Sequence, residues 1–159
     1  MEGKKTMKAL IVYYSFYRNN TKKIARIFAG KLAADLVNLK DSYDIKAGEY
    51  DVIGFGSGVY RESVSPRLND AIRKLDLKDK RVFVFTTSGV GMRYYNKRTI
   101  SLLKSRGAIC KGSFSCKGSF TSREFSSNKI FEAMSRFSTG HPDKKDIKKA
   151  ESFIEKLEL

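Results

Sequence analysis

Residues 8–25 read Lys8-Ala-Leu-Ile-Val-Tyr-Tyr-Ser-Phe-Tyr-Arg-Asn-Asn-Thr-Lys-Lys-Ile-Ala25. The run up to Tyr14 is almost continuously apolar, which is typical of a strand buried on both faces of a parallel sheet. A polar loop follows, and then apolar residues recur at spacings of three and four from Ile24 to Ala33. This spacing predicts a helix that Asn20 or Thr21 caps. A buried strand, a polar loop and a helix together form the first half of a βαβ unit.

The alternation of strands and helices continues along the chain. Four more apolar stretches predict strands, with the first of them weak and at an edge: 36–39, 51–56, 81–87 and 108–116. Three more helices are predicted after Ser65-Pro66, over about 96–104 and after Pro142-Asp143. Such alternation predicts one α/β domain with a doubly wound, five-stranded parallel sheet of order 2-1-3-4-5 and helices on both faces.

Two segments do not fit this alternation. Residues 1–7 are polar and basic, and we expect a flexible N-terminal extension. Residues 118–140 have no clear period, and we expect a long excursion after the fifth strand.

Length and composition indicate the class of protein. The chain has 159 residues, of which 41% are hydrophobic, enough for the packed core of one domain. No apolar run approaches the roughly 20 residues that cross a bilayer, and the run before Ser15 is shorter than a signal-peptide core of roughly 7–15 residues. We therefore expect a soluble cytoplasmic protein.

Side chains for catalysis or metal binding are sparse. Cys110 and Cys116 do not form a CxxC pair, and we expect reduced thiols in or near a strand. His141 is the only histidine and precedes Pro142 in a predicted loop. No catalytic residue and no metal ligand is predicted.

The chain is strongly basic. Lys and Arg number 32 against 17 Asp and Glu, a formal net charge of +15. Between Arg81 and Arg136 the only acidic residues are Glu124 and Glu132. This imbalance favours acidic partners, nucleic acid or anionic lipid, and it is equally compatible with a cation-rich surface that keeps the protein in solution.

Three loops follow the carboxyl ends of the predicted central strands, where α/β sheets bind ligands. The loop 15–21 offers hydroxyls, amides, an Arg and a helix start, a combination suited to a phosphate. It contains neither GxGxxG nor GxxxxGK[ST], which leaves a phosphate monoester. Gly56 and Gly58 are expected to let the backbone approach a ligand or adopt positive φ. The loops 57–63 and 88–96 combine small residues with Tyr60, Tyr94 and Tyr95, which predicts a site for a planar ring that carries a phosphate tail.

Five ordered stretches resemble the flavodoxin family, in particular its archaeal and clostridial members. Residues 12–25 resemble the phosphate loop and first helix, and 51–60 and 85–89 resemble the third strand and the two flavin loops. Residues 114–118 and 140–146 resemble the fifth strand and the start of the last helix. The chain departs from the family in its basic charge and at Arg18 and Asn19, where flavodoxins usually have Gly and hydroxyl residues.

The resemblance implies a flavodoxin-like fold with FMN as the cofactor. It implies that the phosphate is surrounded by Ser15, Tyr17, Asn19, Asn20 and Thr21, and we add Arg18 from the same loop. It also implies that the second and third loops enclose the isoalloxazine; the residues expected there are Ser57, Gly58, Val59, Tyr60, Thr87, Ser88, Gly89, Val90, Gly91, Tyr94 and Tyr95.

The leading functional hypothesis is therefore a small electron-transfer flavoprotein, with the redox chemistry at FMN itself. One alternative is an FMN-dependent oxidoreductase, such as a protoporphyrinogen dehydrogenase or a quinone reductase, in which residues 126–139 form a cationic amphipathic helix over a membrane or a substrate. Another is a basic binding module without a cofactor. We expect an acidic redox protein as the partner and no specific nucleic acid, with peripheral membrane contact as a weaker alternative.

Overall fold

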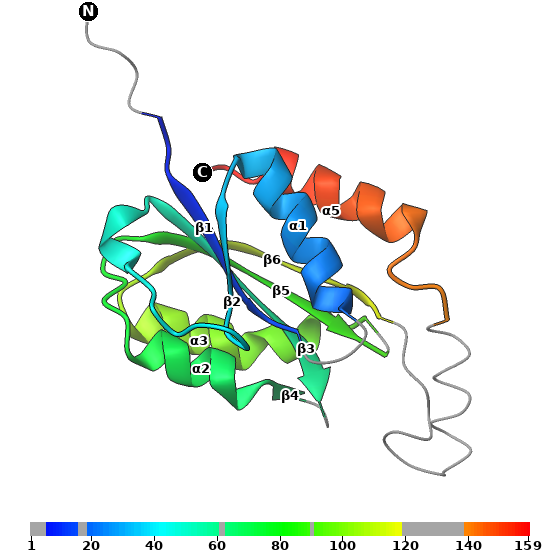
Figure 1. The fold of residues 1–159 in the computed structure, drawn as a ribbon, viewed down its shortest axis with the longest axis horizontal. Coiled ribbons are helices and arrows are strands. Elements are labelled where there is room, and N and C mark those ends of the chain that lie inside the picture. The colour runs from blue at the N-terminus through cyan, green and yellow to red at the C-terminus, as the bar shows by residue number, and fades with distance from the viewer. Residues whose placement is uncertain (1–5, 16–18, 61–62, 90, 119–138) are drawn as a thin grey trace, which may run out of the picture.

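The apolar runs of the sequence form the centre of the molecule. The computed structural model describes residues 6–15, 19–60, 63–89, 91–118 and 139–159. Its strands are β1 (Ala9–Tyr14), β2 (Asp35–Asn38), β3 (Val52–Tyr60), β4 (Ser63–Val64), β5 (Arg81–Ser88) and β6 (Ile109–Lys117). Five of these lie parallel in the order β2-β1-β3-β5-β6, and this confirms the predicted doubly wound sheet (Figure 1).

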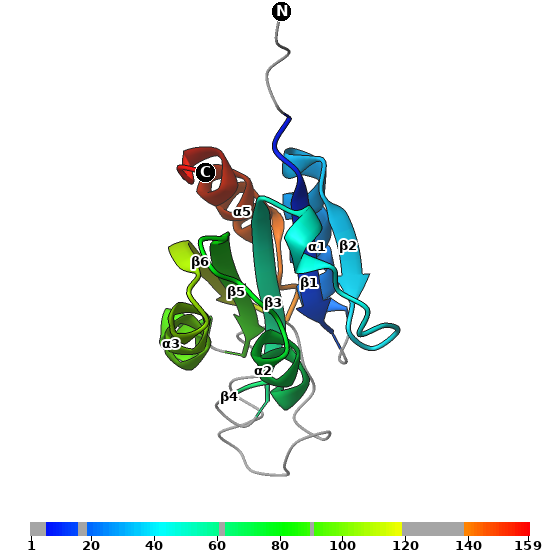
Figure 2. The same ribbon diagram turned by 90° about the vertical axis from the view of Figure 1, so that its left-hand side faces the viewer.

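Helices cover both faces of the sheet, as predicted. Helices α1 (Asn20–Leu32) and α5 (Lys144–Lys156) lie on one face, whereas α2 (Pro66–Arg73) and α3 (Lys97–Ser105) lie on the other (Figure 2). Two short 3₁₀ turns complete the described elements, η1 (Ala47–Glu49) and η2 (Arg93–Asn96). No helix among the described residues is both long and apolar enough to cross a membrane.

The core consists of two layers that share the sheet. Along β1, Leu10 and Val12 pack toward α2 and α3, whereas Ala9 and Ile11 pack toward α1 and α5. This alternation with both faces buried explains why the strand is continuously apolar. Met7, within the predicted N-terminal extension, is half-buried and packs against the layer beneath α1 and α5.

An aromatic cluster joins α1 to the sheet. The ring of Phe28 makes edge contacts with Phe83, Phe85 and Phe114, at centroid distances of 5.5, 5.0 and 5.8 Å. Gly54 and Gly56 of β3 face the same layer, and a Cβ at Gly56 would lie 2.1 Å from the ring of Phe85. The prediction that Gly56 gives a ligand access to the backbone is therefore wrong, because the missing side chain makes room for a core phenylalanine.

Three helix starts were predicted with different success. Ser65 caps α2 by accepting a hydrogen bond from the backbone of Arg67, as expected. Asp143 caps α5 in a reciprocal capping box with Asp146. For α1, however, the N-cap is Asn19, so Asn20 and Thr21 begin the helix rather than cap it.

Candidate functional site

The three predicted ligand loops leave neighbouring strands at the carboxyl edge of the sheet. Tyr14 at the end of β1 pairs in register with Ser57 of β3, and Ser57 pairs with Thr86 of β5. These three residues therefore lie at one level on adjacent strands, at or just before the starts of the predicted loops. This is the position at which doubly wound sheets bind ligands.

The first loop contains a buried hydroxyl that lacks a partner. Ser15 is only 3% exposed, and its Oγ makes no hydrogen bond to any described residue. A buried hydroxyl left in this state costs about 1–3 kcal/mol. Because such groups are rare in folded proteins, this Oγ is a candidate hydrogen-bond donor to a bound ligand.

The start of α1, at the other end of this loop, is open to an anion. Asn19 adopts a left-handed conformation with φ 54°, and its side chain makes no capping hydrogen bond. The first turn contains no acidic residue. A helix start without a cap presents N–H groups and a partial positive charge, and both favour a phosphate.

Two contacts fix this helix start against the neighbouring strands. The hydroxyls of Thr21 and Thr87 lie 2.8 Å apart and are both buried, so they join α1 to the end of β5. Gly118, just after β6, packs tightly on Asn20: a Cβ added to Gly118 would lie 2.7 Å from the Nδ2 of Asn20. The buried side chains of Asn20, Thr21 and Thr87, all predicted cofactor contacts, therefore belong to the frame of the site.

The second predicted loop is mostly a strand. β3 continues to Tyr60 and pairs back with β4, so residues 57–60 form one arm of a short hairpin. The Ser57 hydroxyl donates to the carbonyl oxygen of Gly58 at 2.6 Å and accepts from the Ser65 backbone at 3.0 Å. Ser57 thereby fixes the hairpin to the start of α2, while Val59, which pairs with Val64, is partly exposed.

The third loop is held by its own serine. Ser88 Oγ accepts a 2.7 Å hydrogen bond from the backbone N–H of Gly91, and the Ser88 carbonyl accepts one of 2.9 Å from Gly118. Gly91 has φ 67° and lies 3.1 Å, measured from an added Cβ, from the backbone of β6, so only glycine suits this position. The loop therefore bends sharply against β6.

Exposed aromatic and apolar side chains follow this bend. Tyr94 is 63% exposed and Met92 is 51% exposed, which makes them two of the five exposed large hydrophobic residues among those described. The ring of Tyr95 contacts that of Tyr94 edge-on at 6.0 Å, and the Lys97 ammonium lies 5.4 Å from the centre of the Tyr94 ring. These contacts give Tyr94 a defined position beside the carboxyl edge.

A buried polar network that the sequence did not reveal joins Asn96, the last residue of η2, to β5 and β6. Asn96 is fully buried, accepts a 2.6 Å hydrogen bond from Thr86 Oγ1 and donates to the Phe114 carbonyl and to Ser115 Oγ, each at 3.2 Å. Thr86 and Ser115 also lie 2.8 Å apart. Only the pairing of β5 with β6 brings these residues together, so no local pattern identifies the network.

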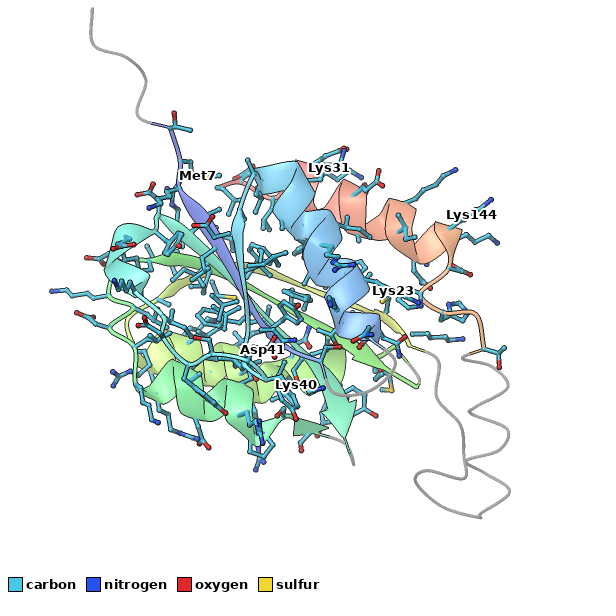
Figure 3. The ribbon with its side chains drawn as sticks, in the orientation of Figure 1. Met7, Lys23, Lys31, Lys40, Asp41 and Lys144 are labelled. Carbon is cyan, nitrogen blue, oxygen red and sulfur yellow. The ribbon has the colours of Figure 1, made fainter. Side chains whose placement is uncertain are left out.

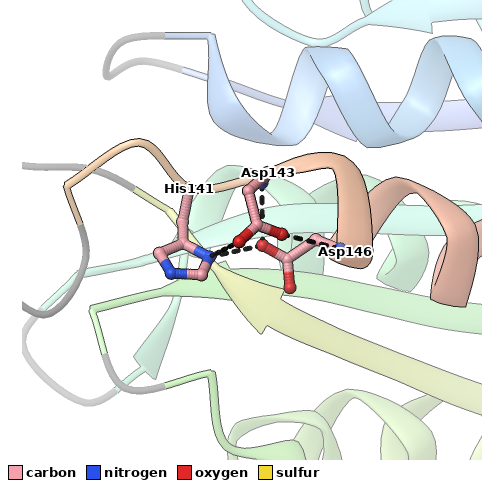
Figure 4. Close-up of polar contacts among 3 residues, drawn as sticks. All are labelled: His141, Asp143 and Asp146. Carbon is pink, nitrogen blue, oxygen red and sulfur yellow. Dashed lines mark hydrogen bonds and ion pairs between the residues drawn. The ribbon is translucent and has the colours of Figure 1, made fainter.

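His141 has carboxylate partners that its loop position did not predict. Its Nδ1 lies 2.5 Å from Asp146 Oδ2 and 3.7 Å from Asp143 Oδ2, at the start of α5 (Figure 4). The backbone N–H of Asp146 lowers the pKa of Asp143, and His141 contributes less. His141, Asp143 and Asp146 are close enough to ligate a cation, but both carboxylates also accept backbone hydrogen bonds of the capping box. The group serves as a helix cap.

Both cysteines lie on β6 as free thiols, as predicted. Burial raises the pKa of Cys116, and the negative charges of Asp146 and Asp143 raise it further. A thiol that stays protonated is a poor nucleophile.

Several predicted cofactor residues are not placed here. Tyr17, Arg18, Val90 and all of the predicted amphipathic segment 126–139 except Thr139 lie outside the described residues, as does the side chain of Tyr60. Their assignments stay predictions.

Comparison with known proteins identifies the family. The profile of the flavodoxin domain matches residues 10–107, which cover all three loops. The chain belongs to the flavodoxin family. An uncharacterized protein of Methanocaldococcus jannaschii is 36% identical to it over 154 residues, which cover 95% of this chain and 98% of the relative.

Solved structures share the fold of this flavodoxin-family chain at low sequence identity. Flavodoxin 2 from Bacillus cereus superimposes with a TM-score of 0.63 and 18% identity, covering 92% of this chain and 94% of the other. A flavoprotein from Lactobacillus acidophilus, solved in complex with FMN, gives a TM-score of 0.52 and 18% identity, with coverages of 67% and 91%.

Proposed function

We propose that this flavodoxin-family protein binds FMN at the carboxyl edge of its sheet and carries electrons between proteins. The observation that carries the proposal is the buried, unpartnered hydroxyl of Ser15 in the loop that leads to the uncapped start of α1. A phosphate there would accept the Ser15 hydrogen bond and would be favoured by the helix dipole.

The residues of the edge fit the rest of the cofactor. Tyr94 offers an exposed aromatic face after β5, and the partly exposed Val59 lies on the neighbouring strand β3. When bound, FMN supplies one- and two-electron redox chemistry. The chain contributes rigid placement, through the hydroxyl pair of Thr21 and Thr87 and the network around Asn96.

The cysteine and the histidine that lie nearest the site along β6 and before α5 are both constrained by their surroundings. The buried Cys116 thiol has a raised pKa, and His141 belongs to the cap of α5. Neither group is therefore available for acid–base or nucleophilic chemistry, which leaves redox chemistry at FMN, in a carrier or in an oxidoreductase.

Titration of the flavin-free protein tests the proposal. We expect FMN to bind more tightly than riboflavin, because riboflavin lacks the phosphate. FAD should also bind more weakly than FMN, because the loop has no pyrophosphate fingerprint. Equal binding of all three flavins would contradict the phosphate site.

Turnover assays distinguish the carrier from the enzyme. The FMN-loaded protein should exchange electrons with a redox protein but show no catalytic turnover of quinones or protoporphyrinogen. Sustained turnover of either compound would replace the carrier with the oxidoreductase.

A further inference from the structure

The first turns of the helices in this protein carry positive charge, which opposes the helix dipole. α1, α2 and α3 have no acidic residue in the first turn, where the helix dipole favours one. Cations occupy these turns instead, and α5 also begins with two lysines. The exposed ones, which we term the basic rim, are Lys23, Arg67, Arg93, Lys97, Arg98, Lys144 and Lys145.

The basic rim surrounds the candidate site. In a parallel α/β sheet all helix starts lie at the carboxyl edge of the strands, so cations from four helices and η2 gather there. Lys23 and Lys144 lie toward this edge, whereas Lys31 lies at the far end of α1 (Figure 3). The positive ends of the helix dipoles add to the same field.

Cations at the opposite ends of the helices are arranged differently. Lys31 and Arg73 lie in the last turns of α1 and α2, where they complement the dipole, and they form ion pairs with Glu155 and Asp70. Asp76 and Asp79 also follow the end of α2. No cation of the basic rim forms an ion pair with another residue of the described ranges. Other exposed cations, Lys74 and Lys104 among them, also form no ion pair with a described residue, so the cations of the basic rim are distinguished by their place around the candidate site.

The centre of this edge is suited to protein contact. Met92 and Tyr94 are exposed on either side of Arg93, next to Lys97 and Arg98 of α3. Apolar and aromatic side chains within a charged rim are typical of a protein–protein interface. Acidic residues are also present on this side of the sheet: Asp41 and Asp44 follow the end of β2, and Asp143 and Asp146 cap the start of α5.

We infer that the basic rim is the docking surface for an acidic redox protein, which approaches the flavin site along the field of the rim. This inference rests on the proposed function, because the electron passes between that protein and the FMN held inside the rim. Electrostatic complementarity of this kind mainly raises the association rate and selects the partner. Nucleic acid and anionic lipid are the competing ligands of such a surface.

Matched charge reversals test the surface. Arg93→Glu/Arg98→Glu changes the rim, and Lys74→Glu/Lys104→Glu changes exposed residues at the C-terminal ends of α2 and α3. Each double variant lowers the formal net charge by four, from +15 to +11. Circular dichroism confirms that both fold. A difference between them therefore reports the position of the charge.

The readout is the rate at which a reduced, acidic ferredoxin transfers its electron to the FMN-loaded protein in stopped flow. At low salt we expect the rim variant to slow this rate about tenfold or more and the control variant to slow it less than about threefold. The wild-type rate should fall steeply as salt rises to 0.1 M and beyond, where the screening length is about 10 Å. Equal slowing by both variants, or by neither, would overturn the inference.

Calorimetric binding of the same ferredoxin to the flavin-free protein separates this inference from the proposed function. We expect binding at low salt that the rim variant weakens and the control variant preserves, whether or not FMN binds. Phosphatidylglycerol vesicles and a single-stranded 20-mer DNA are the competing probes. If the rim variant loses affinity for either of these while ferredoxin binding is unchanged, the surface is assigned to that ligand and the inference is wrong.

Discussion

The hydroxyls of Thr21 and Thr87 form a buried hydrogen bond of 2.8 Å that joins the first turn of α1 to the end of β5. Replacing either residue with valine keeps the shape and leaves the other hydroxyl buried without its partner. We expect each single variant to lose about 1–3 kcal/mol of unfolding free energy. The double variant Thr21→Val/Thr87→Val should lose less than the sum, because it leaves no orphaned hydroxyl. Urea unfolding of the four proteins measures the coupling, and additive losses would contradict it.

Ser15→Ala separates stability from ligand binding. The Ser15 hydroxyl has no partner among the described residues, so its removal should leave the unfolding free energy of the flavin-free protein unchanged or slightly higher. FMN affinity should fall by about 1.5–3 kcal/mol, or roughly 10- to 150-fold, because a hydrogen bond to a charged oxygen is lost. Riboflavin affinity is the internal control and should change little. A parallel loss for both flavins would show that Ser15 does not contact the phosphate.

Gly56 and Gly30 give opposite predictions for the same substitution. A Cβ at Gly56 would lie 2.1 Å from the Phe85 ring, so Gly56→Ala should destabilise the fold by about 1–3 kcal/mol. A Cβ at Gly30, exposed in α1, would meet nothing within 4 Å, and Gly30→Ala should stabilise the fold by about 0.5–1 kcal/mol. Thermal or urea unfolding measures both. Combining Gly56→Ala with Phe85→Leu should recover part of the loss, and no recovery would exclude the clash as its cause.

The sequence predicts the features of this protein that depend on neighbouring residues. The apolar runs at β1 and β5 are continuous because both faces are buried, and Ser65-Pro66 marks a helix start by local chemistry. The predicted role of Gly56 in ligand access is wrong, because the residue that requires a glycine there, Phe85, lies on another strand.

The same distinction applies to the site. Ser15 and the loop at the start of α1 could be recognised from the order of residues along the chain. The hydrogen bonds of Thr21 with Thr87 and of Asn96 with Thr86 could not, because strand order and register bring these residues together. The prediction that Asn20 or Thr21 caps α1 is wrong for a local reason. Asn19 adopts the left-handed conformation and is itself the N-cap, so the helix begins at Asn20.

The capping box of α5 should make stability depend on acid pH. The backbone N–H of Asp146 donates to Asp143 at 2.9 Å and lowers the pKa of that carboxyl. A carboxyl whose pKa is lower in the folded state stabilises the fold above its unfolded pKa of about 3.9, and this stabilisation disappears as the pH falls through the folded value. Because Asn also caps helices, Asp143→Asn removes the charge and keeps the cap.

We therefore expect the wild type to be more stable than Asp143→Asn from pH 7 to about pH 5, and the difference to shrink below about pH 4. Urea unfolding at several pH values measures this difference. Glu158→Gln, at an exposed carboxyl beyond the end of α5, is the control and should show a flat difference. A gap between wild type and Asp143→Asn that does not shrink as the pH falls from 4 to 2.5 would show that the difference comes from the geometry of the cap, because protonation of the unfolded carboxyl begins near its pKa of about 3.9.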